Sequence, residues 1–145
     1  MIEENGRLEK AVEALLEKNA TCVIITDNEM KVSHERGVKP LLMLIDQNCD
    51  VCGGVSADKV VGKAAAMLYI LLGIGELYAC VISELALKAL SNSNIKVRYD
   101  KVVPMIRNRT DTGFCPMEQA VKDIDEPTEA LRAIKITLKA LSEKK

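Results

Sequence analysis

The segment from Arg109 to Glu118 reads Arg-Thr-Asp-Thr-Gly-Phe-Cys-Pro-Met-Glu and combines the most reactive residue types of the chain. Proline is favoured at the first position of a helix, where its missing N–H is no loss. Pro116 therefore predicts a helix start, with Cys115 at the positive end of the helix dipole, where a thiolate is stabilised. Glu118 falls in the first turn, and Arg109 and Thr110 lie on the polar loop before it. This pattern predicts Cys115 and Glu118 as catalytic residues beside a cation that could hold an anion.

The same cysteine also has a purely structural interpretation. A Cys-Pro pair at a helix start can pack the thiol beneath the preceding loop, and burial among apolar groups makes a thiol unreactive. The residue types alone leave both interpretations open.

A second polar segment, residues 58–66, reads Asp-Lys-Val-Val-Gly-Lys-Ala-Ala-Ala. It predicts the start of a helix capped by Ser56 or Asp58. The small side chains after Lys63 would let a sheet or a ligand approach closely, so Asp58 is a candidate catalytic carboxylate and Lys59 and Lys63 are candidate ligand-binding residues. Tight helix–sheet packing is the structural alternative. A phosphate-binding loop is not predicted, because its first glycine and its final hydroxyl residue are missing.

The cysteines and the single histidine do not predict a metal centre. Cys49 and Cys52 form a CxxC pair, but a structural zinc site needs two more ligands. The remaining candidates, Cys80, Cys115 and His34, fall in separate predicted elements. We therefore expect no metal and no cofactor, and we interpret His34 as a solvated or capping residue at the end of a hairpin.

Composition excludes several classes of protein. The 145 residues are 48% apolar and 28% charged, which is typical of one soluble domain spanning residues 1–145. The 20 basic and 21 acidic residues nearly cancel, and base-stacking aromatics are scarce, so no nucleic-acid partner is expected. The longest apolar run, residues 64–75, is too short to cross a membrane. Five cysteines without an export signal predict reduced thiols in the cytoplasm.

The apolar patterns predict a mixed α/β fold. A helix over 5–19 is followed by a hairpin, a helix and then alternating helices and strands, which predicts parallel strands with helices on both faces. The fold class is thus a three-layer α/β/α sandwich whose mixed sheet begins with an N-terminal hairpin. The expected elements are strands 21–26 and 30–33, a helix over 38–45, a loop over 49–56, a helix over 57–72, strand 76–82, a helix over 83–90, strand 95–99, and helices starting at Pro116 and Pro127.

This fold predicts where the polar residues meet. Ligands of open parallel sheets bind at the carboxyl ends of the strands. We therefore expect Asp58, Lys63, the helix-capping Ser83 and the 109–118 loop to converge in one cleft.

Four motifs together resemble one bacterial family. They are residues 35–42 (Glu-Arg-Gly-Val-Lys-Pro-Leu-Leu), residues 58–66, residues 102–104 (Val-Val-Pro) and residues 115–118 (Cys-Pro-Met-Glu). In this order they resemble the domain of unknown function numbered 1893 over nearly the whole chain. The resemblance implies a fold like that of the cytidine deaminases, and it implies no known reaction.

The zinc motifs of the deaminases are missing from the positions that we compare with them. Those enzymes carry His-x-Glu or Cys-x-Glu at the start of the helix after the hairpin, and Pro-Cys-x-x-Cys after the next strand. Here residues 56–59 read Ser-Ala-Asp-Lys, and residues 80–84 read Cys-Val-Ile-Ser-Glu. Zinc-dependent deamination is therefore the less favoured function. The cleft would instead contain Asp58, Lys63, Ser83, Cys115 and Glu118.

Two functions remain open. One is metal-free binding of a nucleoside, a nucleotide or a related anionic metabolite. The other is an enzyme that uses Cys115 as a thiolate nucleophile or redox thiol. We also expect a homo-oligomer, because a chain so rich in Ala, Leu and Met could bury a helix face against its own copy. The candidate ligand-binding residues are Lys59, Lys63, Ser83, Arg109 and Thr110.

Overall fold

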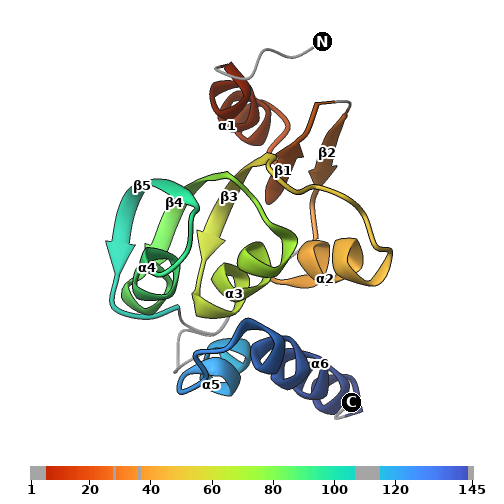
Figure 1. Cartoon of the computed structure of the whole chain (residues 1–145), viewed down its shortest axis with the longest axis vertical. Coiled ribbons are helices and arrows are strands. Elements are labelled where there is room, and N and C mark those ends of the chain that lie inside the picture. Colours follow the sequence, from red (N-terminus) through yellow and green to blue (C-terminus); the bar gives the residue numbers. More distant parts are fainter. Residues whose placement is uncertain (1–5, 28, 36, 107–114, 144–145) are drawn as a thin grey trace.

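One mixed sheet forms the centre of the molecule. The computed structural model describes residues 6–27, 29–35, 37–106 and 115–143. Within them lie the strands β1 (Cys22–Ile25), β2 (Met30–Ser33), β3 (Val55–Val61), β4 (Glu76–Ser83) and β5 (Lys96–Val103). Their order across the sheet is β2-β1-β3-β4-β5 (Figure 1). β1 is antiparallel to both of its neighbours, and β3, β4 and β5 are parallel. The N-terminal hairpin and the mixed sheet are therefore confirmed.

Helices cover both faces of this sheet. They are α1 (Arg7–Glu17), α2 (Lys39–Asp46), α3 (Lys63–Leu72), α4 (Glu84–Ser91), α5 (Pro116–Val121) and α6 (Pro127–Glu143). α1 packs on β1, β3 and β4 from one side, whereas α3 and α4 cover the other side. α5 and α6 pack against α3 (Figure 1). This arrangement confirms the three-layer sandwich and the helix starts at Pro116 and Pro127.

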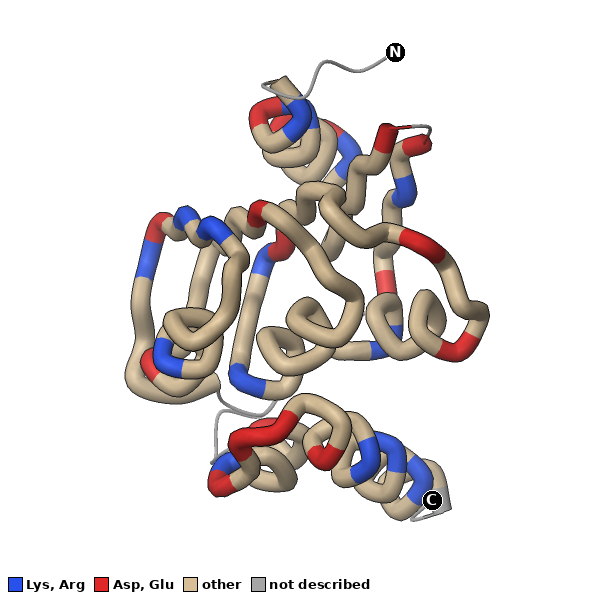
Figure 2. Tube along the Cα trace, viewed as in Figure 1, with Lys and Arg blue, Asp and Glu red and all other residues tan. Residues whose placement is uncertain are grey.

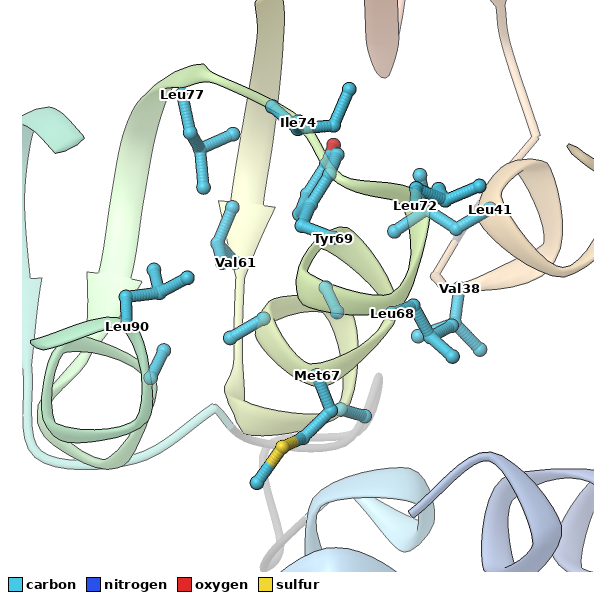
Figure 3. Packing of buried hydrophobic residues seen from close by; sticks show 14 of the residues in the cluster. Val38, Leu41, Val61, Met67, Leu68, Tyr69, Leu72, Ile74, Leu77 and Leu90 are labelled. Carbon is cyan, nitrogen blue, oxygen red and sulfur yellow. The ribbon is translucent and has the colours of Figure 1, made fainter. Parts of the chain in front are cut away.

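α3 is the most deeply buried helix of the described chain. Its three alanines and most of its larger apolar residues are buried against the sheet, α2, α4 and α6 (Figure 3). The small side chains at its start allow this close approach, as the structural interpretation of the sequence predicts. Most charged residues lie on the outer helices and loops (Figure 2). In the part of the chain that the structure describes, no helix is long and apolar enough to cross a membrane.

The predicted helix over 57–72 is wrong in its first third. Residues 55–61 form β3, and α3 begins only at Lys63, after Gly62 in extended conformation. Val55 and Ala57 pack beneath α1, while Ser56 and Asp58 are hydrogen-bonded to Tyr69 of α3. Apolar and polar residues alternate over 55–58, but both faces of β3 are buried there. Ser56 and Asp58 resembled a helix cap because their hydrogen-bond partner, Tyr69, lies 13 and 11 residues away in the sequence.

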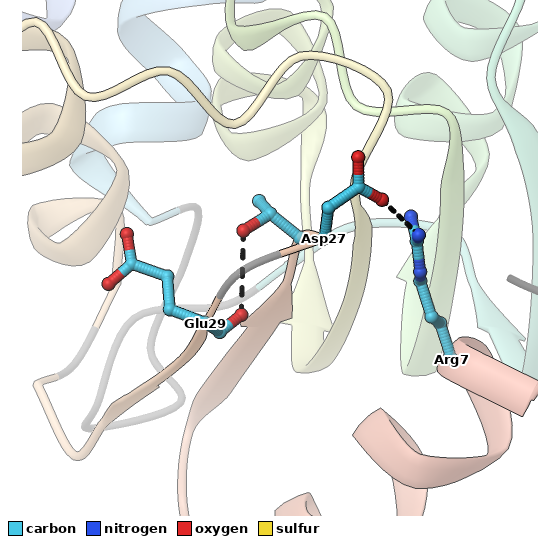
Figure 4. Close-up of polar contacts among 4 residues, drawn as sticks. Arg7, Asp27 and Glu29 are labelled. Carbon is cyan, nitrogen blue, oxygen red and sulfur yellow. Dashed lines mark hydrogen bonds and ion pairs between the residues drawn. The ribbon is translucent and has the colours of Figure 1, made fainter. Parts of the chain in front are cut away.

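The hairpin is tied to the N-terminal helix by an ion pair. Arg7, at the start of α1, pairs with Asp27 in the turn between β1 and β2 (Figure 4). In the same turn the hydroxyl of Thr26 donates to the carbonyl oxygen of Glu29, 3.5 Å away. The Arg7 side chain is largely buried and that of Asp27 is exposed. This contact adds to the apolar packing that holds α1 over the β1 side of the sheet.

Candidate functional site

The start of α3 is capped by a carboxylate from another helix. The N–H groups in the first turn of a helix have no partner within the helix and favour a negative charge. Here Glu118 of α5 accepts hydrogen bonds from the N–H of Lys63 at 2.5 Å and of Ala64 at 3.1 Å. The side chain of Glu118 is buried, and its carboxylate takes the place that an external anion would occupy. Two motifs that lie more than 50 residues apart in sequence therefore meet, as predicted.

Gly62 makes room for this contact. A Cβ atom at this position would lie 2.2 Å from Oε1 of Glu118 and 2.3 Å from its Cδ. Any other residue would push the carboxyl group away from the helix start. The glycine is therefore required by space, and not by its backbone angles, because its φ is −98°.

Lys63 is committed to structural contacts. The residue is only 5% exposed. Its Nζ donates to the carbonyl oxygen of Lys122 at 2.9 Å and lies 3.6 Å from Oδ1 of Asp125. The ammonium group thus holds the segment between α5 and α6 against the start of α3. An anion would have to replace these partners to reach it.

Ser83 and Cys115 occupy the helix-cap positions that the sequence predicts. The Ser83 hydroxyl accepts from the N–H of Ala86 at 3.1 Å and caps α4. Cys115 is the N-cap residue of α5, and its own N–H donates to the carbonyl oxygen of Ile106 at 3.1 Å. The Cys115 side chain is partly buried and packs against the main core cluster. These surroundings agree with the structural interpretation of the Cys-Pro pair.

Lys59, another predicted ligand-binding residue, lies elsewhere. The Nζ of Lys59 donates to Oδ1 of Asn19 at 2.9 Å. Asn19 lies just after the end of α1. Lys59 is therefore directed to the α1 end of the fold, away from the contact between α3 and α5. Arg109 and Thr110 fall outside the described residues.

Asp58 belongs to a separate, buried polar network and not to a helix start. It lies within β3, 9% exposed, and accepts from the Tyr69 hydroxyl at 2.7 Å. The Ser56 hydroxyl donates to the same Tyr69 oxygen at 2.9 Å. The Cys22 sulfur of β1 lies 3.3 Å from that oxygen. The predicted cap role of Asp58 is therefore wrong, and its grouping with Lys63 at one helix start is wrong with it.

Burial dominates the protonation of this network. Desolvation raises the pKa of the Asp58 carboxyl to about 7, although hydrogen bonds from Tyr69 and from backbone N–H groups oppose the rise. Desolvation and the nearby Asp58 charge raise the pKa of the Cys22 thiol to about 12. The pKa of Tyr69 is raised for the same reasons. At neutral pH, Cys22 and Tyr69 are thus uncharged, and Asp58 can change its charge.

The CxxC pair and the histidine are not assembled into a metal site. Cys49 is partly buried, Cys52 is exposed, and both are free thiols. His34 Nε2 lies 3.0 Å from the carbonyl oxygen of Lys18, which agrees with its predicted capping role. Over the described residues, no group of three His, Cys, Asp or Glu side chains is placed to hold a metal ion.

Hollows open on the surface of the described chain, among them one beside α1 and one beside α2, and the sequence predicted neither. The larger of these two is an open hollow of about 600 Å³ between α1 and the strands β4 and β5. The smaller, of about 200 Å³, lies between β2 and α2 and has Cys22 on its wall. The lining of the larger one, which we call the α1 groove, comprises Leu8, Glu9, Val12, Glu13, Tyr78, Arg98, Tyr99 and Asp100.

Comparison with known proteins gives the family. A family model described as TM1506, domain of unknown function (DUF1893), matches residues 10–138. The chain belongs to this family. It is also similar to the crystal structure of a DUF1893 family protein (TM1506) from Thermotoga maritima, with 28% sequence identity and a TM-score of 0.82, over 97% of this chain and 92% of that one. No curated protein matches the chain.

The fold of this DUF1893 chain also corrects the comparison with the deaminase motifs. The helix after the hairpin is α2, which begins at Lys39, whereas residues 56–59 lie within β3 and do not correspond to the first deaminase motif. The helix after the next strand is α3, which begins with Lys-Ala-Ala-Ala, and residues 80–84 belong to a later strand and helix. The first turn of α3 offers neither a thiol nor an imidazole. The first N–H group of α3 instead donates to the Glu118 carboxylate.

We predict that Glu118→Ala lowers the free energy of unfolding by about 1–3 kcal/mol, because two buried N–H groups lose their acceptor. Glu118→Gln should be less harmful, since the amide oxygen can still accept one bond. Urea denaturation measures both, with the exposed Glu17→Ala as a control that changes stability by less than about 0.5 kcal/mol. Gly62→Ala should be much less harmful in the Glu118→Ala background than alone. Additive effects of the two substitutions would contradict this account.

We predict that Asp58→Asn removes a pH dependence of stability. The folded-state pKa of about 7 lies above the ordinary value of 3.8, so below pH 4 the carboxyl is protonated in both states. Between these values the unfolded chain loses its proton first, and stability falls as pH rises, by as much as about 4 kcal/mol. Burial also raises the pKa of Glu118, which adds to the same slope.

Asparagine can still accept from Tyr69 and has no charge to desolvate. The Asp58→Asn chain should therefore be more stable than the wild type at pH 8, and it should be no more stable than the wild type at pH 4. Urea denaturation across this range tests it, with the exposed Asp123→Asn as the matched control. Parallel pH profiles for Asp58→Asn and the wild type would refute the desolvated state of Asp58.

Proposed function

We propose that this chain binds a small planar ligand of the nucleoside class in the α1 groove. The observation that carries the proposal is the size and lining of the groove. Its volume of about 600 Å³ is within the range of small-molecule sites. The nucleoside class comes from the resemblance to the cytidine deaminases, and the lining of the groove narrows that class.

The walls of the groove suit a flat, partly apolar ligand. Leu8 and Val12 project from α1, and the Tyr78 ring lies opposite on β4. An aromatic ring between such walls gains stacking and apolar contact. The Tyr78 hydroxyl donates to the Asp100 carboxylate, and this bond raises the pKa of the hydroxyl, which stays protonated. The ring is therefore held in place before any ligand arrives.

The charges of the groove select against phosphate. Three carboxylates, those of Glu9, Glu13 and Asp100, line it with one cation, Arg98. Arg98 is already partnered, since its Nη1 lies 3.7 Å from Oε1 of Glu9. The acidic lining favours ligands that donate hydrogen bonds or carry positive charge, and it repels a phosphate group. Among the ligands considered from the sequence, a nucleoside fits better than a nucleotide or another anionic metabolite.

The start of α3, where Lys63 was expected to help bind an anionic ligand, is a weaker candidate for the binding site. The N–H groups at the start of α3 are satisfied by Glu118, and Lys63 contacts the Lys122 carbonyl and Asp125. The alternative function, an enzyme with Cys115 as nucleophile or redox thiol, is not favoured by the packing of Cys115 against the core. Ligand binding without turnover is therefore the proposed function.

Binding is tested by calorimetric or NMR titration of the full chain with adenosine, cytidine, guanosine and uridine and with their monophosphates. At least one nucleoside should bind about tenfold more tightly than its monophosphate, which corresponds to about 1.4 kcal/mol. Tyr78→Ala should weaken that binding at least tenfold. Glu13→Gln should reduce the ratio between the affinity for the nucleoside and the affinity for its monophosphate. The exposed Ile136→Ala on α6 is the control that leaves binding unchanged. Tighter binding of a monophosphate, or binding insensitive to Tyr78→Ala, would overturn the proposed site.

We propose further that binding needs no metal. The structural basis is that the described histidine and cysteines fall in separate places, with no third acidic, thiol or imidazole group beside any pair. Elemental analysis of chain purified without an affinity tag should find much less than one zinc ion per chain. Stoichiometric zinc that is lost in the Cys49→Ser, Cys52→Ser double variant would contradict this prediction.

A further inference from the structure

We propose that two copies of this chain pair edge to edge through β5, antiparallel, with Tyr99 facing Tyr99 of the second copy. The proposal concerns assembly and does not depend on the ligand of the α1 groove. It gives the expected homo-oligomer a specific surface and register.

β5 is an open edge in the described part of the chain. It pairs with β4 on one side, and Figure 1 shows no helix beyond its other side. The strand is eight residues long, whereas β2 at the opposite edge has four. An exposed edge strand presents a row of N–H and C=O groups that another strand can pair with. β5 therefore offers the longer ladder for a second copy.

Symmetry leaves few possible registers. A two-fold axis relating two antiparallel edge strands runs perpendicular to the sheet, so the residue at the axis faces its own copy. An axis at Arg98, Asp100 or Lys101 would place like charges directly opposite each other. An axis at Val97 would place Lys96 of each copy opposite Arg98 of the other, which gives two pairs of like charge. Like charges in these positions destabilise a strand pair.

An axis at Tyr99 avoids all of these conflicts. It places Arg98 of each copy opposite Asp100 of the other, which gives two pairs of opposite charge, and it pairs the two tyrosines. Lys96 then faces Val102. Tyr99 is 46% exposed and Val102 is 37% exposed in the single chain, and both would lose exposed apolar area. Among axes at residues 97–101, charge complementarity thus selects one register, and the partner that fits it is a second copy of the chain.

The contacts already made by these side chains are compatible with pairing. Arg98 reaches Glu9 with one nitrogen, and a guanidinium has further N–H groups to donate. Asp100 accepts from Tyr78 through one oxygen and has further acceptor sites. Because Arg98 and Asp100 also line the α1 groove, the two grooves of the pair would lie on the same side of one continuous sheet.

The decisive experiment is a charge exchange read by light scattering of the full chain over a range of concentrations. The wild type should have twice the mass of one chain. Arg98→Asp alone and Asp100→Arg alone each place like charges opposite each other and should shift the protein to monomer. The double variant restores opposite charges and should restore the dimer. Lys10→Asp, an exposed change of the same charge on α1, should leave the dimer intact.

Cross-linking tests the register itself. Opposite residues of an antiparallel pair have Cβ atoms about 4.5–5.5 Å apart, close to the spacing that a disulfide spans. Tyr99→Cys treated with oxidised glutathione should form a covalent dimer on a non-reducing gel, and Ile136→Cys should not. A monomeric wild type at the highest attainable concentration, a dimer that survives both single charge changes, or equal cross-linking of both cysteine variants would overturn the proposal.

Discussion

The contact between the Glu118 carboxylate and the start of α3 is the interaction on which the rest of the described fold depends. The first turn of α3 is buried, so its first N–H groups cannot turn to water and need a protein acceptor. The carboxylate comes from α5, which fixes the position of that short helix. Gly62 is then required for space, and Lys63 is drawn to the Lys122 carbonyl and to Asp125. One capping contact thereby anchors both C-terminal helices.

The buried polar network has a comparable role on the opposite end of α3. The Tyr69 hydroxyl contacts both Ser56 and Asp58, and keeping both of these hydrogen bonds favours one rotation of α3 over β3. A purely apolar contact would tolerate several rotations. This arrangement places a carboxyl in a dry environment, and that desolvation raises the pKa of Asp58. Polar groups in this core therefore specify orientation at some expense in stability.

The sequence predicts those elements whose signals are local. The hairpin, the Ser83 cap and the proline-initiated helices each depend on a few adjacent residues, and all are confirmed. β3 was missed because its polar residues are satisfied from a distant helix. The meeting of Lys63 with Glu118 was predicted, but not that Glu118 itself would fill the anion position. No pattern in the sequence indicates a hollow, because the α1 groove is formed where one helix stops covering a sheet.

That unequal coverage explains why the groove and the open edge are neighbours. α1 alone covers its face of the sheet in the described chain, and it packs mainly over β1 and β3. The opposite face is covered by α3 and α4, so β4 and β5 are left half exposed on one side only. The residues at this boundary must tolerate water in the single chain, which explains why β5 carries charges between its apolar positions. These charges also limit which strand can pair with β5, because the charges of that strand must be opposite in sign to those they face. A β5 strand of the same sequence, centred on Tyr99, satisfies that condition without any change to the chain.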